Sequence, residues 1–138
     1  MKTMGLDLGT RTLGIALSDA LGMMAHGLET FRFEEKHYKK AIAHVQQLQK
    51  AHPISTIVLG LPKNMNGSIG FRGEETKAFA EKLKEATDLP VILWDERLTT
   101  MQVEKVLIAA DVSRKKRKSV VDKMAATVIL QSYLDSKS

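Results

Sequence analysis

Three acidic positions stand where carboxylates could perform chemistry. Asp7 interrupts an apolar stretch, the pair Asp95 and Glu96 directly follows the apolar run 91–94, and Asp122 lies near the start of the last predicted helix. Converging carboxylates form a hard, oxygen-rich site that suits Mg²⁺ or Mn²⁺ rather than zinc, and the chain has no cysteine. Two such ions about 4 Å apart can activate a water and stabilise the leaving oxygen of a phosphodiester. The pattern therefore predicts a metal site for phosphodiester hydrolysis.

The first two acidic positions also have a purely structural interpretation. Asp7 could lie on an edge strand or support the turn that follows it. Side chains alternate along a strand, so only one of Asp95 and Glu96 should share a face with Asp7, and the sequence leaves open which. Either of the two could instead pair with Arg97 or Lys105 on the surface.

Asp122 has a stronger structural alternative. It follows Ser119 by three residues, which is close to a capping box, and an acid is favoured in the first turn of a helix. The small residues Ala125 and Ala126 favour the functional interpretation, because they would let this helix approach a sheet closely.

Basic and polar side chains near these acids predict contacts with a nucleic-acid backbone. One group lies in the turn after the first strand and in the polar loop around residues 62–72, and another is a run of five consecutive cations just before Asp122. Such a run is usually a solvated segment, but beside an acidic site it could direct phosphates toward metal ions. Trp94 and the phenylalanines are predicted to be core, with no aromatic stacking platform. The predicted contacts are Arg11, Lys63, Asn64, Arg72, Arg97, Arg114, Lys115, Lys116, Arg117 and Lys118.

The elements that must position these residues follow from hydrophobic periodicity. Apolar alternation with short turns predicts strands at 4–8, 13–18 and about 25–33, in an antiparallel meander. Three- and four-residue steps from Tyr38 to Leu48 predict a helix that ends before Pro53. Buried strands are expected at 56–61 and 90–94, with a helix carrying Phe79 and Leu83 between them.

Two further helices, at about 100–110 and 120–134, are predicted on either side of the basic run. The expected fold is α/β: a mixed five-stranded sheet, with a three-strand antiparallel meander plus parallel strands, and helices on both faces. In such a sheet the carboxyl ends of the parallel strands share one edge, where ligands usually bind.

Composition sets the outer limits. The 138 residues predict a single domain, 1–138, and 43% hydrophobic with 27% charged residues is ordinary for a folded protein. A formal net charge of +5 favours polyphosphate partners but fits a solvated surface equally well. No apolar run is long enough to cross a bilayer, and Asp7 interrupts what a signal peptide would need to be apolar, so we expect a cytoplasmic protein with no membrane partner.

Four motifs resemble the YqgF (RuvX-like) family, in the family's order and over nearly the whole chain. They are DLGTRTLGIA at 7–16, GLP at 60–62 with NGS at 66–68, DERLTT at 95–100, and DKMAA at 122–126. The first motif alone also occurs in actin-like and sugar-kinase ATPases, whereas the four together are specific. Related resolvases carry an acid near the strand that ends at GLP, and this chain does not.

The resemblance implies an RNase H-like fold and a nuclease that depends on a divalent metal, Mg²⁺ or Mn²⁺, with two ions. It implies that Asp7, Glu96 and Asp122 are catalytic metal ligands, with Asp95 as the alternative to Glu96 for the second acid. The names given to the family point to two substrates. One is the precursor of 16S rRNA, which could be bound within ribosomal precursor particles, and the other is a Holliday junction. We expect 5′ processing of pre-16S rRNA. Two alternatives stay open: a dimeric resolvase that acts on branched DNA, and a non-catalytic RNA-binding assembly factor. The oligomeric state, monomer or homodimer, also stays open.

Overall fold

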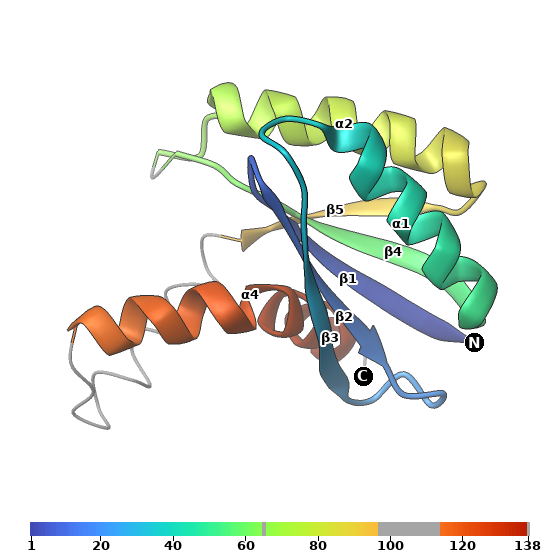
Figure 1. Ribbon diagram of the computed structural model, residues 1–138. Coiled ribbons are helices and arrows are strands. Elements are labelled where there is room, and N and C mark those ends of the chain that lie inside the picture. The colour runs from blue at the N-terminus through green and yellow to red at the C-terminus, as the bar shows by residue number, and fades with distance from the viewer. Residues whose placement is uncertain (65, 97–113, 138) are drawn as a thin grey trace.

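The computed structural model describes residues 1–64, 66–96 and 114–137, and for 114–123 it describes only the backbone. The described elements form a sheet with helices on both of its faces (Figure 1). They are β1 (Lys2–Leu8), β2 (Thr12–Ser18), β3 (Ala25–Arg32), α1 (Tyr38–Ala51), β4 (Ile54–Leu61), α2 (Phe71–Thr87), β5 (Val91–Asp95) and α4 (Arg114–Ser136).

The sheet has five strands in the order β3-β2-β1-β4-β5. β1 pairs antiparallel with β2, and β2 with β3, which gives the predicted meander. β4 pairs parallel with β1 and with β5, so these three strands end at the same edge of the sheet. The predicted mixed sheet is confirmed. Because β1 is its central strand, the interpretation of Asp7 as an edge residue is wrong.

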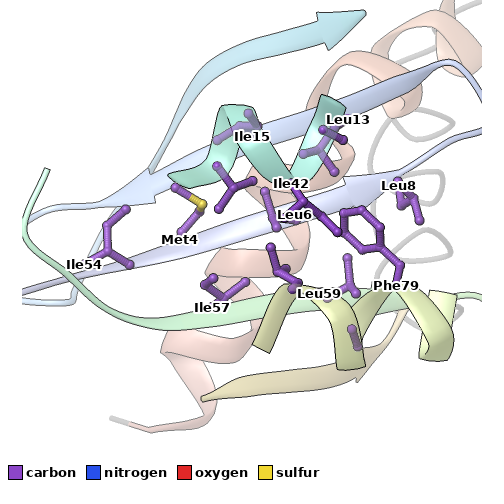
Figure 2. Close-up of a cluster of buried hydrophobic side chains, with 14 of the residues drawn as sticks. Met4, Leu6, Leu8, Leu13, Ile15, Ile42, Ile54, Ile57, Leu59 and Phe79 are labelled. Atoms are coloured by element: carbon purple, nitrogen blue, oxygen red, sulfur yellow. The ribbon is translucent and has the colours of Figure 1, made fainter. Parts of the chain in front are cut away.

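The main core lies between the sheet and the helices α1 and α2. Alternate residues of the strands point to this side, and Figure 2 shows them packed around Phe79 of α2. The apolar run of β4 is buried over most of its length because helices cover both of its faces. The fully buried members of this core include Met4, Leu6, Leu13, Ile57 and Leu59.

The helix α4 covers the opposite face and lies very close to the strands. A Cβ atom added at Gly5 would come within 2.9 Å of the Ala126 carbonyl oxygen and 2.6 Å of Leu130 Cβ. Glycine is therefore needed in β1 for the helix backbone to approach. The predicted close approach at Ala126 is confirmed, and this residue is buried.

Three predictions about the elements are wrong. β5 is half-buried along its length rather than buried, because it ends the sheet among the described residues. α4 begins at Arg114, so the basic run belongs to the helix instead of preceding it, and Ser119 is inside the helix where it cannot cap its start. Arg72 belongs to α2 and not to the polar loop before it. The predicted helix at 100–110 lies outside the described residues.

None of the helices in the described part of the chain combines the length and the apolarity of a bilayer span.

Candidate active site

Asp7 and Glu96 lie on the same face of the sheet, near the shared carboxyl edge of the parallel strands. Asp7 is half-buried in β1 opposite Gly14 of β2. Glu96 directly follows β5, and its Oε2 lies 2.6 Å from the position of a Cβ added at Gly60, on the side of β4 that Ile129 of α4 covers. Of the pair Asp95 and Glu96, it is therefore Glu96 that shares the α4 face with Asp7.

The electrostatics of Glu96 show how closely these acids are packed. Burial raises the pKa of the Glu96 carboxyl from 4.5 to about 7, and the charge of Asp7 is the second cause of this rise. Arg72 lowers the pKa and Asp95 adds a smaller increase. A carboxyl group with this pKa is held where negative charge is unfavourable. A cation at this point would relieve the unfavourable charge.

Gly60 provides the space that the Glu96 carboxylate occupies. Any larger residue in this position of β4 would place its Cβ 2.5 Å from Ile129 Cδ1 and 2.6 Å from Glu96 Oε2. Both distances are far below ordinary contact, so the Ile129 side chain and the Glu96 carboxylate would both have to move. The need for space beside Glu96 and Ile129 therefore explains why the GLP motif has a glycine at this position.

Asp95 points away from this face. Strand alternation puts it on the side opposite Trp94, whose indole donates a 3.1 Å hydrogen bond to Ser132 of α4. The Asp95 carboxylate lies 3.9 Å from Lys63 Nζ, and each side chain is about one quarter exposed. Lys63, which the sequence predicted as a phosphate contact, thus pairs with an acid of the same edge.

Asp122 lies in α4, four residues before Ala126, and its side chain is outside the described residues. Among the side chains that the structure describes, no group of three His, Cys, Asp or Glu is arranged to hold a metal ion. The structure therefore brings together two of the three predicted catalytic acids, Asp7 and Glu96, and leaves the third undescribed.

Arg72 connects α2 to the end of β1. Its Nη2 donates a 2.9 Å hydrogen bond to the Leu8 carbonyl oxygen, next to Asp7, and its Nη1 lies 3.4 Å from Glu75 Oε1. Glu75 in turn accepts a 3.0 Å hydrogen bond from the Tyr38 hydroxyl of α1. This network ties both helices of one face to the strand that carries Asp7.

Two other predicted nucleic-acid contacts, Arg11 and Asn64, lie in the loops that follow β1 and β4 at the same edge. Arg11 is 70% exposed and lies 3.5 Å from Glu35, an exposed ion pair. Asn64 donates a 3.0 Å hydrogen bond to Ser68 Oγ, within a loop that closes on itself. The basic run 114–118 lies in the first turns of α4, with undescribed side chains, and Arg97 lies outside the described residues.

Phe71 is a residue that sequence reasoning missed. The prediction that the phenylalanines are core is wrong here, because Phe71 is 70% exposed at the first position of α2. The buried face of α2 carries Thr76, Phe79, Ala80 and Leu83, and Phe71 is off this stripe. Phe71 precedes Phe79 by eight residues, a spacing that still fits one helix face, so periodicity counted from Phe79 does not reveal its exposure.

A shallow groove of about 200 Å³ opens beside Asp7, between the β2–β3 ribbon and α4. It is lined by Gly14, the pairing partner of Asp7, and by Gly27, Glu29, Thr30, Ala126 and Thr127, among others. The groove therefore follows the α4 face of the meander and reaches the strand next to Asp7.

Sequence comparison relates the chain to one family along its whole length. The RuvX family model, described as Holliday junction resolvase, matches residues 1–136. Relatives named "Putative pre-16S rRNA nuclease" include one from Geobacillus kaustophilus, 57% identical over 137 residues and 99% of each chain. Another, from Bacillus subtilis, is 57% identical over 136 residues and 99% of each chain.

Solved structures relate the fold to resolvases. RuvC of T. thermophilus in complex with a Holliday junction substrate superposes with a TM-score of 0.66 at 14% identity, over 99% of this chain and 95% of that one. The fowlpox virus Holliday junction resolvase gives a TM-score of 0.56 at 13% identity over the full length of both chains. These likenesses confirm the RNase H-like fold. With the family match and the close relatives, they lead to one conclusion: the chain belongs to the RuvX family, a family of phosphodiester-hydrolysing nucleases.

Proposed function

We propose that this chain is a divalent-metal-dependent endonuclease that cleaves structured RNA, in the 5′ processing of pre-16S rRNA. The observation that carries the metal-dependent mechanism is the pair Asp7 and Glu96, two carboxyl groups on the α4 face of the sheet. Burial, and next the charge of Asp7, raises the pKa of Glu96. The substrate is suggested by the relatives named "Putative pre-16S rRNA nuclease". Their sequences are 57% identical to this chain over 99% of its length.

The donor groups fit Mg²⁺ or Mn²⁺. The known donors are carboxylate oxygens, which these hard cations prefer. The pKa of Glu96 is raised first by burial and next by the charge of Asp7, so its ionised form needs a counter-charge at this point. Bound divalent ions, two in our proposal, would supply a water of lowered pKa and a counter-charge for the leaving oxygen. Asp7 and Glu96 would hold them from β1 and from the end of β5. Asp95, which faces Lys63 on the other side of the sheet, would act on this site through its charge.

Asp122 would complete the set of ligands from α4. Positions four residues apart lie on one face of a helix, and Ala126 contacts the sheet beside Gly14 and Asp7. We therefore propose Asp122 as the third catalytic acid, one turn further along this face.

The basic residues would hold the RNA backbone around the acids. Arg11 suits this role because an exposed ion pair such as that with Glu35 is weak, so a phosphate can displace the carboxylate. The basic run in the first turns of α4, together with Lys63, Asn64 and Arg97, would extend this contact. Arg72 would act differently, by fixing the end of β1 through its bond to the Leu8 carbonyl.

The test is cleavage of a precursor RNA that contains the 5′ end of 16S rRNA, with Mn²⁺, by the wild type and by Asp7→Asn. We expect wild-type cleavage, no cleavage by Asp7→Asn, and unchanged folding and RNA binding in that variant. Glu81→Gln removes an exposed acid on α2 and should cleave normally. Full activity of Asp7→Asn would remove Asp7 from the mechanism.

A second candidate is resolution of branched DNA by a homodimer, favoured by the description of the family model and by the fold of the resolvases. Resolution needs two active sites on two strands, for which a symmetric dimer is the natural solution. Sedimentation with and without a four-way junction, beside cleavage of both substrates, separates the candidates: a monomer that cuts only RNA excludes resolution.

A third candidate is a non-catalytic RNA-binding factor that acts on ribosomal precursor particles. It predicts binding that chelation does not change and no cleavage of either substrate. Depletion in cells followed by mapping of rRNA 5′ ends addresses the biological role. Accumulated precursor supports RNA processing in the cytoplasm, and normal rRNA with recombination defects supports resolution.

A further inference from the structure

Phe71 presents an aromatic ring to solvent at the edge of the sheet that carries the acids. The residue is 70% exposed, and the Lys36 ammonium lies over its ring, 5.1 Å from the centroid. The cation covers one face of the ring, and the high exposure leaves the other face open. An open aromatic face beside a cation is the surface on which unpaired bases stack.

Phe71 is connected to the catalytic edge by short contacts. The next residue, Arg72, donates its hydrogen bond to Leu8, which follows Asp7 in the chain. Arg72 is also near enough to Glu96 to lower its pKa. Phe71 and the acids therefore lie at the same edge of the sheet, the ring on the α2 side and the acids on the α4 side. A strand that crosses this edge would meet both.

Lys36, the cation over Phe71, is fixed to the turn that follows β1. The Lys36 backbone N–H donates a 2.7 Å hydrogen bond to the Thr10 carbonyl oxygen, so Lys36 stands beside the turn that carries Arg11. Lys36 keeps half of its side chain exposed, and Arg11 keeps 70%. One exposed cation at the ring and a second in the adjoining turn match the alternation of phosphate and base along a nucleic-acid strand.

The surroundings favour a nucleobase over a protein partner. The contacts that the structure gives to this part of the surface are charged: Lys36, Arg72 and Glu75. Protein interfaces usually present contiguous apolar patches, whereas single-strand binding surfaces combine isolated aromatic rings with cations.

We propose that Phe71 is a stacking site for an unpaired nucleobase of the substrate, next to the phosphate that is cleaved. This inference rests on the proposed nuclease function and narrows its substrate class to RNA with a single-stranded segment at the cleavage point. Lys36 supports the ring from its other face, and Arg11 holds a phosphate of the same segment.

The experiment measures binding of the full chain to a hairpin RNA with a single-stranded 5′ extension, in EDTA so that no cleavage occurs. The same RNA is made with abasic nucleotides in the extension. For the wild type, removal of the bases should weaken binding. Phe71→Ala should weaken binding of the intact RNA roughly five- to hundredfold and should no longer distinguish the abasic RNA. Phe71→Tyr should behave as the wild type.

Leu21→Ala is the matched control, because Leu21 is 83% exposed in the β2–β3 turn at the opposite end of the sheet. It should bind both RNAs as the wild type does. Equal affinities of Phe71→Ala and wild type for the intact RNA would overturn the stacking site, and so would an equal abasic effect in the two proteins. A DNA strand of the same sequence shows whether the site requires ribose.

Because binding is read without cleavage, this result is independent of the nuclease assay. A protein that cleaves precursor RNA while Phe71→Ala binds normally keeps its proposed function and loses the stacking site. A protein that cleaves nothing but shows the Phe71 and abasic effects keeps the stacking site and loses the proposed function.

Discussion

Glu96→Gln should make the metal-free protein more stable at alkaline pH while abolishing its activity. The folded-state pKa of Glu96 is about 7, against 4.5 for an ordinary glutamate. A raised pKa means that the stability from this group is complete below pH 4.5 and is lost as the pH rises through about 7. The difference of about 2.5 pH units corresponds to about 3 kcal/mol, at about 1.4 kcal/mol per unit. Glutamine has nearly the same shape and never ionises.

The assay is thermal or urea unfolding in EDTA at several pH values from 5 to 8. The wild type should lose about 2.5 kcal/mol of this contribution over that range, and Glu96→Gln should not. At pH 8 the variant should melt roughly 10 °C higher, and near pH 5 the two proteins should nearly coincide. Added Mn²⁺ should stabilise the wild type and leave the variant almost unchanged.

Glu81→Gln serves as the control, because Glu81 is exposed on α2. It should follow the wild type at each pH and in the cleavage assay. If Glu96→Gln also follows the wild type at both ends of the pH range, the buried charge inferred for Glu96 does not exist. Retained cleavage by Glu96→Gln would contradict its role as a ligand.

Three further changes test neighbouring parts of the site. Gly60→Ala should destabilise the protein by about 1–3 kcal/mol and reduce cleavage, because its Cβ would overlap Ile129 and Glu96. Gly14→Ala is the control for the same unfolding assay. It should cost far less stability, because its Cβ meets only contacts of 3.5 Å or more. Arg72→Met should raise the pKa of Glu96 further, since Arg72 lowers it, and titration of the side-chain carboxyl by NMR would detect a failure to rise. Calorimetry should show Mn²⁺ affinity decreasing as the pH falls below 7, with proton release on binding, because a protonated carboxyl competes with the cation; pH-independent affinity would speak against Glu96 as a ligand.

Much of the fold could be predicted from periodicity alone. The strands β1, β2 and β4 alternate or run apolar over their full length, and short turns between the first three leave only a meander. Asp7 stood out because a carboxylate inside such a strand is unusual, and the sheet order makes that strand central.

The details of the site depend on contacts between distant segments. Which of Asp95 and Glu96 faces Asp7 is decided by the register of β5 against β4 and by the space over Gly60. The start of α4 escaped prediction because consecutive cations were interpreted as a solvated break, whereas Lys and Arg are good helix formers. Phe71 escaped because residue type alone assigned it to the core.

The most direct test of the central claim is a crystal structure of the wild type with Mn²⁺, in which anomalous scattering locates the metal. Our account predicts manganese bound by the carboxylates of Asp7 and Glu96, with Asp122 of α4 among its ligands. Manganese bound elsewhere, or a site at this edge to which Asp7 contributes no oxygen, would contradict it.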